Sequence, residues 1–167
     1  MAVMPMSDGE SRKPPRRWKG VDPARSRTMS LVRGKDTAPE MTVRRLVHRM
    51  GYRYGLHCRD LPGKPDMVFR SRKKIIFVHG CFWHGHNAPS CRRARVPKTR
   101  REFWSAKIER NGKRDAMTEQ TLREAGWKVL IIWECETSSR AQDILVKRII
   151  SFLGQRSKRP GRQQVRR

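Results

Sequence analysis

The stretch Val78–His86, VHGCFWHGH, concentrates chemically useful side chains directly after an apolar run. Three of the five histidines of the chain lie here, together with Cys81 and two large aromatic residues. Imidazole and thiolate groups bind transition metals, imidazole exchanges protons near neutral pH, and aromatic rings stack on bases. The sequence therefore allows a metal site, a catalytic site and a DNA-contacting wedge within one loop.

Four candidate metal ligands lie in and after this stretch. Cys81, His86 and Cys91 have the spacing C-x4-H-x4-C, and Cys135 follows the apolar run VLIIW. Thiolate and imidazole together favour zinc, and four protein ligands with no open position are typical of a structural site. The spacing is not a standard finger spacing, so reduced thiols, with Cys135 buried in the core, are an equal alternative. Cys58, before the turn LPGKPD, is expected to be a bystander.

A second set of residues could hydrolyse a phosphodiester. Asp66 opens the strand in LPGKPDMVF, where many Mg²⁺-dependent nucleases place a metal-binding acid. His84 could remove a proton from the attacking water, with Asp115 orienting it and His79 as a second imidazole. The structural alternatives are a turn cap for Asp66, a solvated helix face for Asp115 and packing for His79. Spacing alone favours the structural alternative for both aspartates.

Phe82, Trp83 and Trp104 are large aromatic residues within polar, basic sequence. They could stack on bases or wedge between them while the run RRARVPKTRR grips phosphates. The alternative is that they pack the loop onto a helix, which is favoured for Trp104 taken alone. Phe82 and Trp83 are harder to bury, because polar residues follow them directly.

Composition indicates a polyanionic partner. The 167 residues suffice for one domain with a hydrophobic core, and 40 Lys and Arg against 15 Asp and Glu give a formal net charge of +25. Such a surplus opposes compaction unless a polyanion offsets it, so nucleic acid is the first partner to consider.

With no transmembrane-length run and no signal peptide, we expect a cytoplasmic protein with reduced cysteines and no membrane partner.

A mixed pattern of helices and strands positions these residues. Helices are expected over residues 37–51, 100–126 and 138–154, and strands over 65–69, 74–78 and 127–133. The first helix has capping-box spacing at Thr37 and Glu40, the second is expected to break near Asn111-Gly112, and the third to be capped by serine. The first two strands should form a hairpin. The order, taken as α-β-β-β-α-β-α, predicts a mixed β-sheet flanked by helices.

The two ends of the chain differ in composition from its middle. Residues 1–21 are rich in Pro, Arg and Ser, and residues 155–167 are basic without an acid. Both are expected to be disordered basic arms that add phosphate affinity, which leaves residues 22–154 as the folded domain.

Four motifs in a fixed order carry a resemblance: LPGKPDMVF, IIFVHGCFWHGH, VPKTRREFW and GWKVLIIWEC. From about Arg25 to about Cys135 the chain resembles the very short patch repair endonuclease family. The resemblance implies a restriction-endonuclease-like α/β core with a zinc site in the domain of residues 22–154. It also implies recognition of T·G mismatches, formed when 5-methylcytosine deaminates, and a nick on the 5′ side of the thymine.

The resemblance implies catalytic roles as well. Asp66 and the main-chain carbonyl of Val78 match ligands of Mg²⁺. His84 matches the histidine that serves the attacking water, and Asp115 matches its acidic partner. Two further active-site positions are matched by His79 and Glu40.

The zinc ligands and the wedge follow from the same resemblance. The zinc ligands are matched by Cys81, His86, Cys91 and Cys135. Residues that enter the duplex beside the mismatch are matched by Phe82, Trp83, Trp104 and, from the other groove, Met29. Gly85 and Asn87 depart from the His-rich family pattern, and because the segment 87–90 is longer than in the family, the position of Cys91 is less well fixed than that of Cys81.

The partner implied is double-stranded DNA with a T·G mismatch; we expect a monomer, with mismatch-repair proteins as candidate further partners. A zinc-braced DNA-binding protein without activity is the alternative from another class. A general restriction-type nuclease is disfavoured, because Phe77, Val78 and His79 stand where that superfamily carries Glu-x-Lys.

Overall fold

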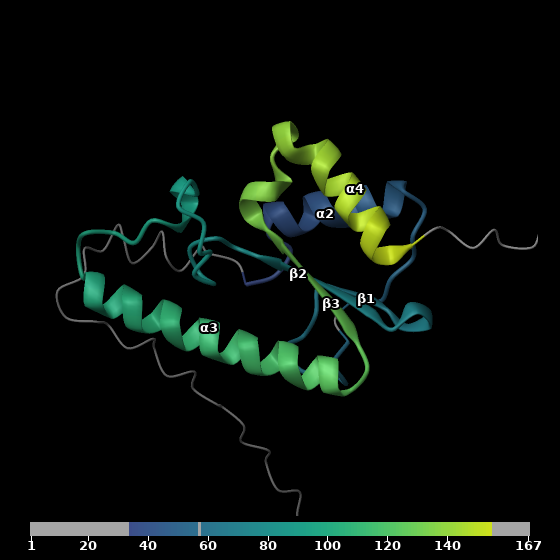
Figure 1. The fold of residues 1–167 in the computed structure, drawn as a ribbon, viewed down its shortest axis with the longest axis horizontal. Helices are drawn as coiled ribbons and strands as arrows, with labels where there is room; N and C mark the ends of the chain where they lie inside the picture. Colours follow the sequence, from purple (N-terminus) through teal and green to yellow (C-terminus); the bar gives the residue numbers. More distant parts are fainter. Residues whose placement is uncertain (1–33, 57, 155–167) are drawn as a thin grey trace, which may run out of the picture. The chain divides into compact units, whose positions relative to one another are not determined.

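The computed structural model describes residues 34–56 and 58–154. The helices are α2 (Ala38–Arg49), α3 (Arg101–Glu124) and α4 (Gln142–Leu153), and the strands are β1 (Met67–Phe69), β2 (Lys74–His79) and β3 (Lys128–Trp133). Figure 1 shows the sheet between α2 and α4 on one side and α3 on the other. The two predicted basic arms, residues 1–21 and 155–167, and Met29 lie outside the described residues.

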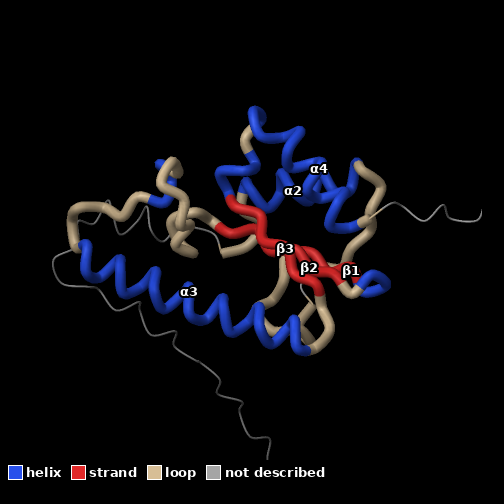
Figure 2. The backbone as a smooth tube through the Cα atoms, viewed as in Figure 1, coloured by secondary structure: helices blue, strands red, loops and turns tan. Residues whose placement is uncertain are grey.

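The sheet is mixed, with the strand order β1-β2-β3 (Figure 2). β1 and β2 are antiparallel and are joined by a short 3-10 turn at Arg70–Arg72, so the predicted hairpin is confirmed. β2 and β3 are parallel, and their connection contains the loop after β2 and then α3. The predicted α/β class, with a mixed sheet flanked by helices, is confirmed.

Each face of the sheet is covered by its own core. One core contains Met67, Phe69, Ile76 and Ile132 of the strands, packed with residues of α2 and α4. The other contains Val68, Ile75, Phe77 and Val129, packed with Leu122 of α3 and with Trp127. Because neighbouring strand residues point to opposite faces, a short continuous apolar run such as IIFV serves both cores.

The start of α2 follows directly from its sequence. The Thr37 hydroxyl accepts a hydrogen bond from the Glu40 amide at 3.5 Å, and the Glu40 carboxylate accepts one from the Thr37 amide at 3.3 Å. This reciprocal pair satisfies two amides that have no partner within the helix, as the predicted capping box requires. The cap also fixes the side chain of Glu40, which faces inward with 5 % of its surface exposed.

Three predicted details of the elements are wrong. α3 is continuous through Asn111-Gly112, because the Asn111 side chain finds a hydrogen-bond partner in the loop after β2. The described residues contain two strands before α3, not the three of the predicted order. α4 begins at Gln142 after a 3-10 turn and has no side-chain cap, so no serine caps it.

Among the described residues, no helix is both long enough and apolar enough to cross a membrane. The longest, α3, is strongly polar, with a half-buried or exposed side chain at nearly every position.

Candidate active site and metal centre

The candidate site lies where β2 and β3 end side by side. The two strands are parallel, and their last residues, His79 and Trp133, are register partners. The chain therefore leaves the sheet twice at the same edge: the loop that begins at Gly80 follows β2, and Cys135 follows β3. This geometry brings residues far apart in sequence to one place, as the carboxyl ends of parallel strands do in α/β proteins.

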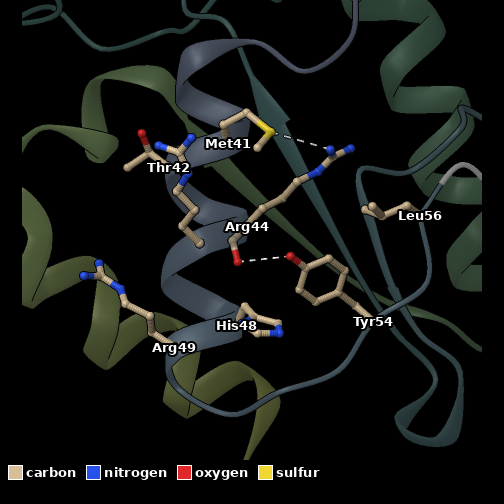
Figure 3. A pocket seen from close by; sticks show the side chains of 8 residues that line it. Met41, Thr42, Arg44, His48, Arg49, Tyr54 and Leu56 are labelled. Carbon is tan, nitrogen blue, oxygen red and sulfur yellow. Dashed lines mark hydrogen bonds between the residues drawn. The ribbon is translucent and has the colours of Figure 1, made fainter.

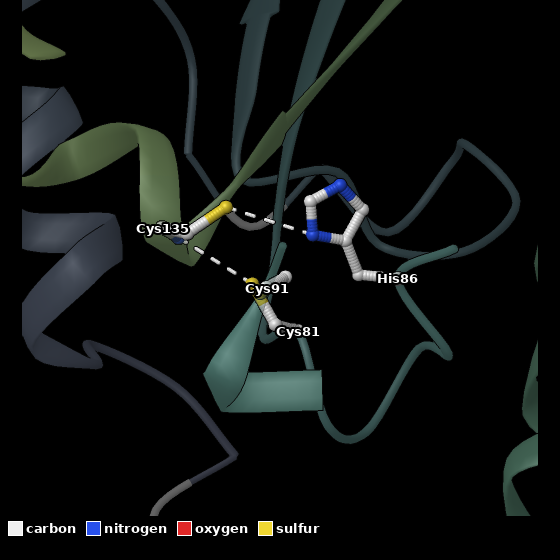
Figure 4. Close-up of side chains that lie close together, drawn as sticks. All are labelled: Cys81, His86, Cys91 and Cys135. Carbon is white, nitrogen blue, oxygen red and sulfur yellow. Dashed lines mark hydrogen bonds between the residues drawn. The ribbon is translucent and has the colours of Figure 1, made fainter. Parts of the chain in front are cut away.

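The four predicted zinc ligands form one cluster. The ligand atoms of Cys81, His86, Cys91 and Cys135 all lie within 4.8 Å of one another (Figure 4). The Cys135 sulfur lies 3.5 Å from His86 Nδ1, and the Cys135 amide donates a hydrogen bond to the Cys81 sulfur at 3.4 Å. Three thiols and one imidazole at this separation fit a tetrahedral metal ion, and this donor set is typical of structural zinc. Cys58 is not part of the cluster, as predicted.

The cluster is held by its backbone and by the burial of one thiol. The His86 amide donates a hydrogen bond to the Cys81 carbonyl at 2.9 Å, and the Cys91 amide donates one to the Ala88 carbonyl at 2.9 Å. The segment 87–90, although longer than in the family, therefore folds back and places Cys91 beside the other ligands. Burial raises the pKa of the Cys81 thiol to about 12. A thiol in such surroundings ionises when a cation is bound beside it, which is the chemistry of a metal ligand.

A second cluster contains the predicted catalytic histidine. His84 Nδ1 lies 2.5 Å from a carboxylate oxygen of Asp115, and the His84 ring stacks on His79 with 4.0 Å between centroids. The carboxylate fixes the tautomer with the proton on Nδ1, which leaves Nε2 free to accept a proton. Burial, and secondarily His84, lower the pKa of His79 to about 4, so His79 is neutral at pH 7.

Asp66 and Glu40 approach the end of β2 from the side of α2. A carboxylate oxygen of Asp66 accepts a hydrogen bond from the Val78 amide at 2.7 Å. Burial, helped by the nearby Glu40 carboxylate and opposed by the Val78 hydrogen bond, raises the pKa of Asp66 to about 7. Glu40 in turn forms an ion pair with Arg44 of α2, whose side chain also contacts Asp36 at 2.6 Å. Two carboxylates pressed together in this way favour a bound cation.

These two groups flank β2 from opposite faces. Glu40 belongs to α2, which packs with the core on one face of the sheet, and Asp115 belongs to α3, which packs with the core on the other face. The structure thus brings all the predicted catalytic residues to one strand end, with the carboxylates toward α2 and the imidazoles toward α3. Asp66 contacts the main chain of Val78 at its amide, whereas the predicted Mg²⁺ ligand is the carbonyl of the same residue.

The pKa of Asp66 predicts a pH dependence of stability for the metal-free protein. Its ordinary pKa is 3.8 and its folded pKa is about 7, so between these values the unfolded chain is ionised while the folded chain holds the proton. The free energy of unfolding should therefore fall with rising pH across this window, by at most about 1.4 kcal/mol per pH unit, and then level off. Asp66→Asn should remove this fall.

Urea unfolding of the wild type and of Asp66→Asn in EDTA, at several pH values, measures the effect as a difference between the two proteins. His79 acts with the opposite sign, since its lowered pKa withdraws stability as the pH falls from about 6.5 to about 4, but it is common to both proteins and cancels. A difference that is constant from pH 4 to pH 7 would contradict the prediction.

The three predicted wedge residues of the described chain lie together. The ring centroids of Phe82 and Trp83 are 5.0 Å apart, those of Phe82 and Trp104 5.4 Å, and those of Trp83 and Trp104 6.0 Å. All three side chains are half-buried, and the ammonium of Lys107 lies over both indole rings, at 5.2 Å and 5.6 Å. Both sequence-based interpretations therefore hold in part. The rings pack the loop onto α3, and their exposed portions form an aromatic surface.

Helix α3 holds both the predicted wedge and the predicted catalytic histidine, and the part played by Asn111 was not predicted from the sequence. Asn111 donates a hydrogen bond to the Trp83 carbonyl at 2.8 Å, and Asp115, one turn later, binds His84. Gly85 has a φ of 64°, and a Cβ there would lie 2.8 Å from a methyl group of Ile108, so the turn requires glycine. Asn111 and Asp115 are four residues apart, so their sequence positions already indicated that both side chains lie on the same face of a helix.

Comparison with known proteins identifies the family. A family model described as DNA mismatch endonuclease Vsr matches residues 21–91. The type II nicking enzyme V.XorIIP of Xanthomonas oryzae pv. oryzae is 51 % identical over 119 residues, which cover 71 % of this chain and 85 % of the relative.

Two further relatives agree. The type II nicking enzyme V.NmeAIP of Neisseria meningitidis is 40 % identical over 70 % of this chain and 81 % of its own length. The DNA mismatch endonuclease Vsr of Escherichia coli is 41 % identical over 70 % of this chain and 72 % of its own length. This chain belongs to the Vsr family of DNA mismatch endonucleases, as the four sequence motifs predicted.

Proposed function

We propose that this protein is a Mg²⁺-dependent endonuclease that nicks double-stranded DNA on the 5′ side of the thymine in T·G mismatches. The observation that carries the proposal is the meeting of Asp66 and Glu40 with His79, His84 and Asp115 at the end of β2. The family supports the substrate class, and the formal charge of +25 supports a DNA partner. The wider proposal is a cytoplasmic monomer with a restriction-endonuclease-like core in residues 22–154, mismatch-repair proteins being candidate further partners.

The hydrolytic step is assigned to His84. Its Nε2 accepts a proton from the water that attacks the phosphorus, while the Asp115 carboxylate holds the ring and stabilises the imidazolium that forms. As the new P–O bond forms, the P–O bond to the neighbouring nucleotide breaks, and the leaving oxygen takes up a proton from solvent water. His79 stacks on the His84 ring and, because it is neutral at pH 7, adds no second positive charge beside the imidazolium. Asp66 and the Val78 carbonyl, with Glu40 beside them, would hold Mg²⁺, which would supply charge stabilisation of the phosphate.

Recognition is assigned to the aromatic residues that lie beside His84. A T·G pair stacks less well than its neighbours, so insertion of Phe82, Trp83 and Trp104 costs less free energy there than at a normal step. Zinc in the cluster of three cysteines and His86 stiffens the loop that carries Phe82, Trp83 and His84. Met29, outside the described residues, is proposed to insert from the opposite groove.

A strand-labelled nicking assay tests the function. Duplexes with a T·G pair in varied flanking sequence, and the same duplexes with T·A, are incubated with the protein in Mg²⁺ or in EDTA. We expect one nick, 5′ of the mispaired thymine, in Mg²⁺ only. Binding of both duplexes with no nick in either condition would favour the non-catalytic DNA-binding alternative, and cutting of both strands would favour a general nuclease.

A further inference from the structure

A basic groove lies along α2, between this helix and the segment that carries Tyr54 and Leu56 (Figure 3). Its volume is about 650 Å³, and we call it the α2 groove. Among the residues that line it are Arg44, Arg45, His48, Arg49, Tyr54 and Leu56. Neither the proposed cleavage site nor the wedge uses this surface.

The charge of the α2 groove is unneutralised. Arg45, His48 and Arg49 are exposed, and none of them forms an ion pair within the described residues. No residue that lines the groove is acidic. Arg44 is different, because its guanidinium is buried and is neutralised by Glu40 and Asp36. The groove thus presents two free guanidinium groups, one helical turn apart, and an imidazole.

Both walls of the α2 groove are tied to the cleavage site. On one wall Arg44 forms an ion pair with Glu40, which lies against Asp66. On the other, Gly55 exchanges two backbone hydrogen bonds with Val68 of β1, at 2.8 Å and 3.0 Å, two residues beyond Asp66. The Tyr54 hydroxyl donates to the Arg44 carbonyl at 3.0 Å and joins the walls. A ligand in the groove is therefore held in a fixed relation to Asp66.

We infer that the α2 groove binds the sugar-phosphate backbone of the DNA duplex beside the phosphate that is cleaved. The inference rests on the proposed function, because it takes the duplex at Asp66 as its starting point. Guanidinium groups match phosphate oxygens in pairs, and Leu56, 41 % exposed, and the Tyr54 ring offer apolar surface to deoxyribose. An open groove suits a polymer that passes through it. Such contacts set the register of the duplex and carry no sequence information.

The salt dependence of DNA binding tests the inference in the full-length protein. The double variant Arg45→Gln/Arg49→Gln is compared with Arg140→Gln/Lys147→Gln, which removes two exposed charges near and on α4. Affinity for T·G and T·A duplexes is measured in EDTA over a series of salt concentrations. Log affinity falls as log salt concentration rises, and the groove variant should make this fall shallower by roughly two units of slope, equally for both duplexes. Each single variant should make it shallower by roughly one unit. The α4 variant should keep the wild-type slope.

A wild-type slope for the groove variant would overturn the inference, and so would an equal loss in the α4 variant, which would indicate a general charge effect. Thermal unfolding of each variant checks that the exposed substitutions leave the fold intact. Because binding is measured without Mg²⁺, the slopes report on the groove even if the protein does not nick. Absence of nicking by the wild type in Mg²⁺ would instead count against the proposed function.

Discussion

Asp66→Asn is expected to lower the rate of nicking at a T·G mismatch by about a thousandfold or more while mismatched DNA is still bound. A divalent ion stabilises charge on the phosphate by several kcal/mol, and each 1.4 kcal/mol corresponds to about a tenfold change in rate. Asp66 is the carboxylate best placed to hold that ion, since the Val78 amide orients it and Glu40 lies beside it. Single-turnover nicking in Mg²⁺ measures the loss.

Asp60→Asn is the matched control. Asp60 is an exposed carboxylate six residues earlier that pairs with Arg70 at 2.8 Å, so its loss removes the same charge without touching the site. DNA binding in EDTA should be at least as tight for Asp66→Asn as for the wild type, because a negative charge near the phosphate is removed. Wild-type nicking by Asp66→Asn would reject Asp66 as the metal-binding acid.

Cys81→Ser is expected to release the metal of the cysteine cluster and to lower nicking by at least about a hundredfold. His84 lies three residues from Cys81 in the same loop, and loss of a positioned general base typically costs 10²–10⁴ in rate. The two cores on the faces of the sheet do not depend on the cluster, so the domain should stay folded while the loop loses its fixed geometry. Zinc per chain, measured by elemental analysis, and single-turnover nicking are the two readouts.

Cys58→Ser provides the control for this prediction, since Cys58 lies outside the cluster and should change neither readout. A Cys81→Ser protein that keeps one zinc ion per chain and nicks at the wild-type rate would contradict a bracing role. A protein that loses zinc and keeps full activity would show that the loop is stiff without metal.

The features that the sequence predicted correctly are those set by local chemistry or by short motifs. The capping box of Thr37 and Glu40 needs only neighbouring residues, and the hairpin needs two apolar runs close in sequence. The cysteine cluster is a long-range feature, and its ligands were found because thiols and imidazoles are rare and the family motifs align them. Residue chemistry alone had left reduced thiols as an equal alternative.

The missed features depend on contacts between distant segments. Asn and Gly have low helix propensity, so the pair Asn111-Gly112 predicted a break. The hydrogen bond from the Asn111 side chain to the Trp83 carbonyl stabilises this part of α3, and the helix continues. Arg44 reads as one more basic residue in a basic chain. Only the fold shows that it is buried against Glu40 and forms a wall of the α2 groove. Tertiary contacts outweigh local helix propensity at Asn111-Gly112 and determine the burial of Arg44.

We propose that recognition of the mismatch is coupled to hydrolysis, because Trp83 and His84 lie in one loop, and nicking by Trp83→Ala is the test of this coupling. Trp83 and His84 are adjacent, and α3 holds both through Asn111 and Asp115. Single-turnover nicking of T·G and T·A duplexes is compared for the wild type and the variant. We expect the variant to lose most of the rate on T·G, so that the ratio of the two rates falls toward one. An unchanged ratio, with wild-type nicking of the T·G duplex, would contradict the coupling.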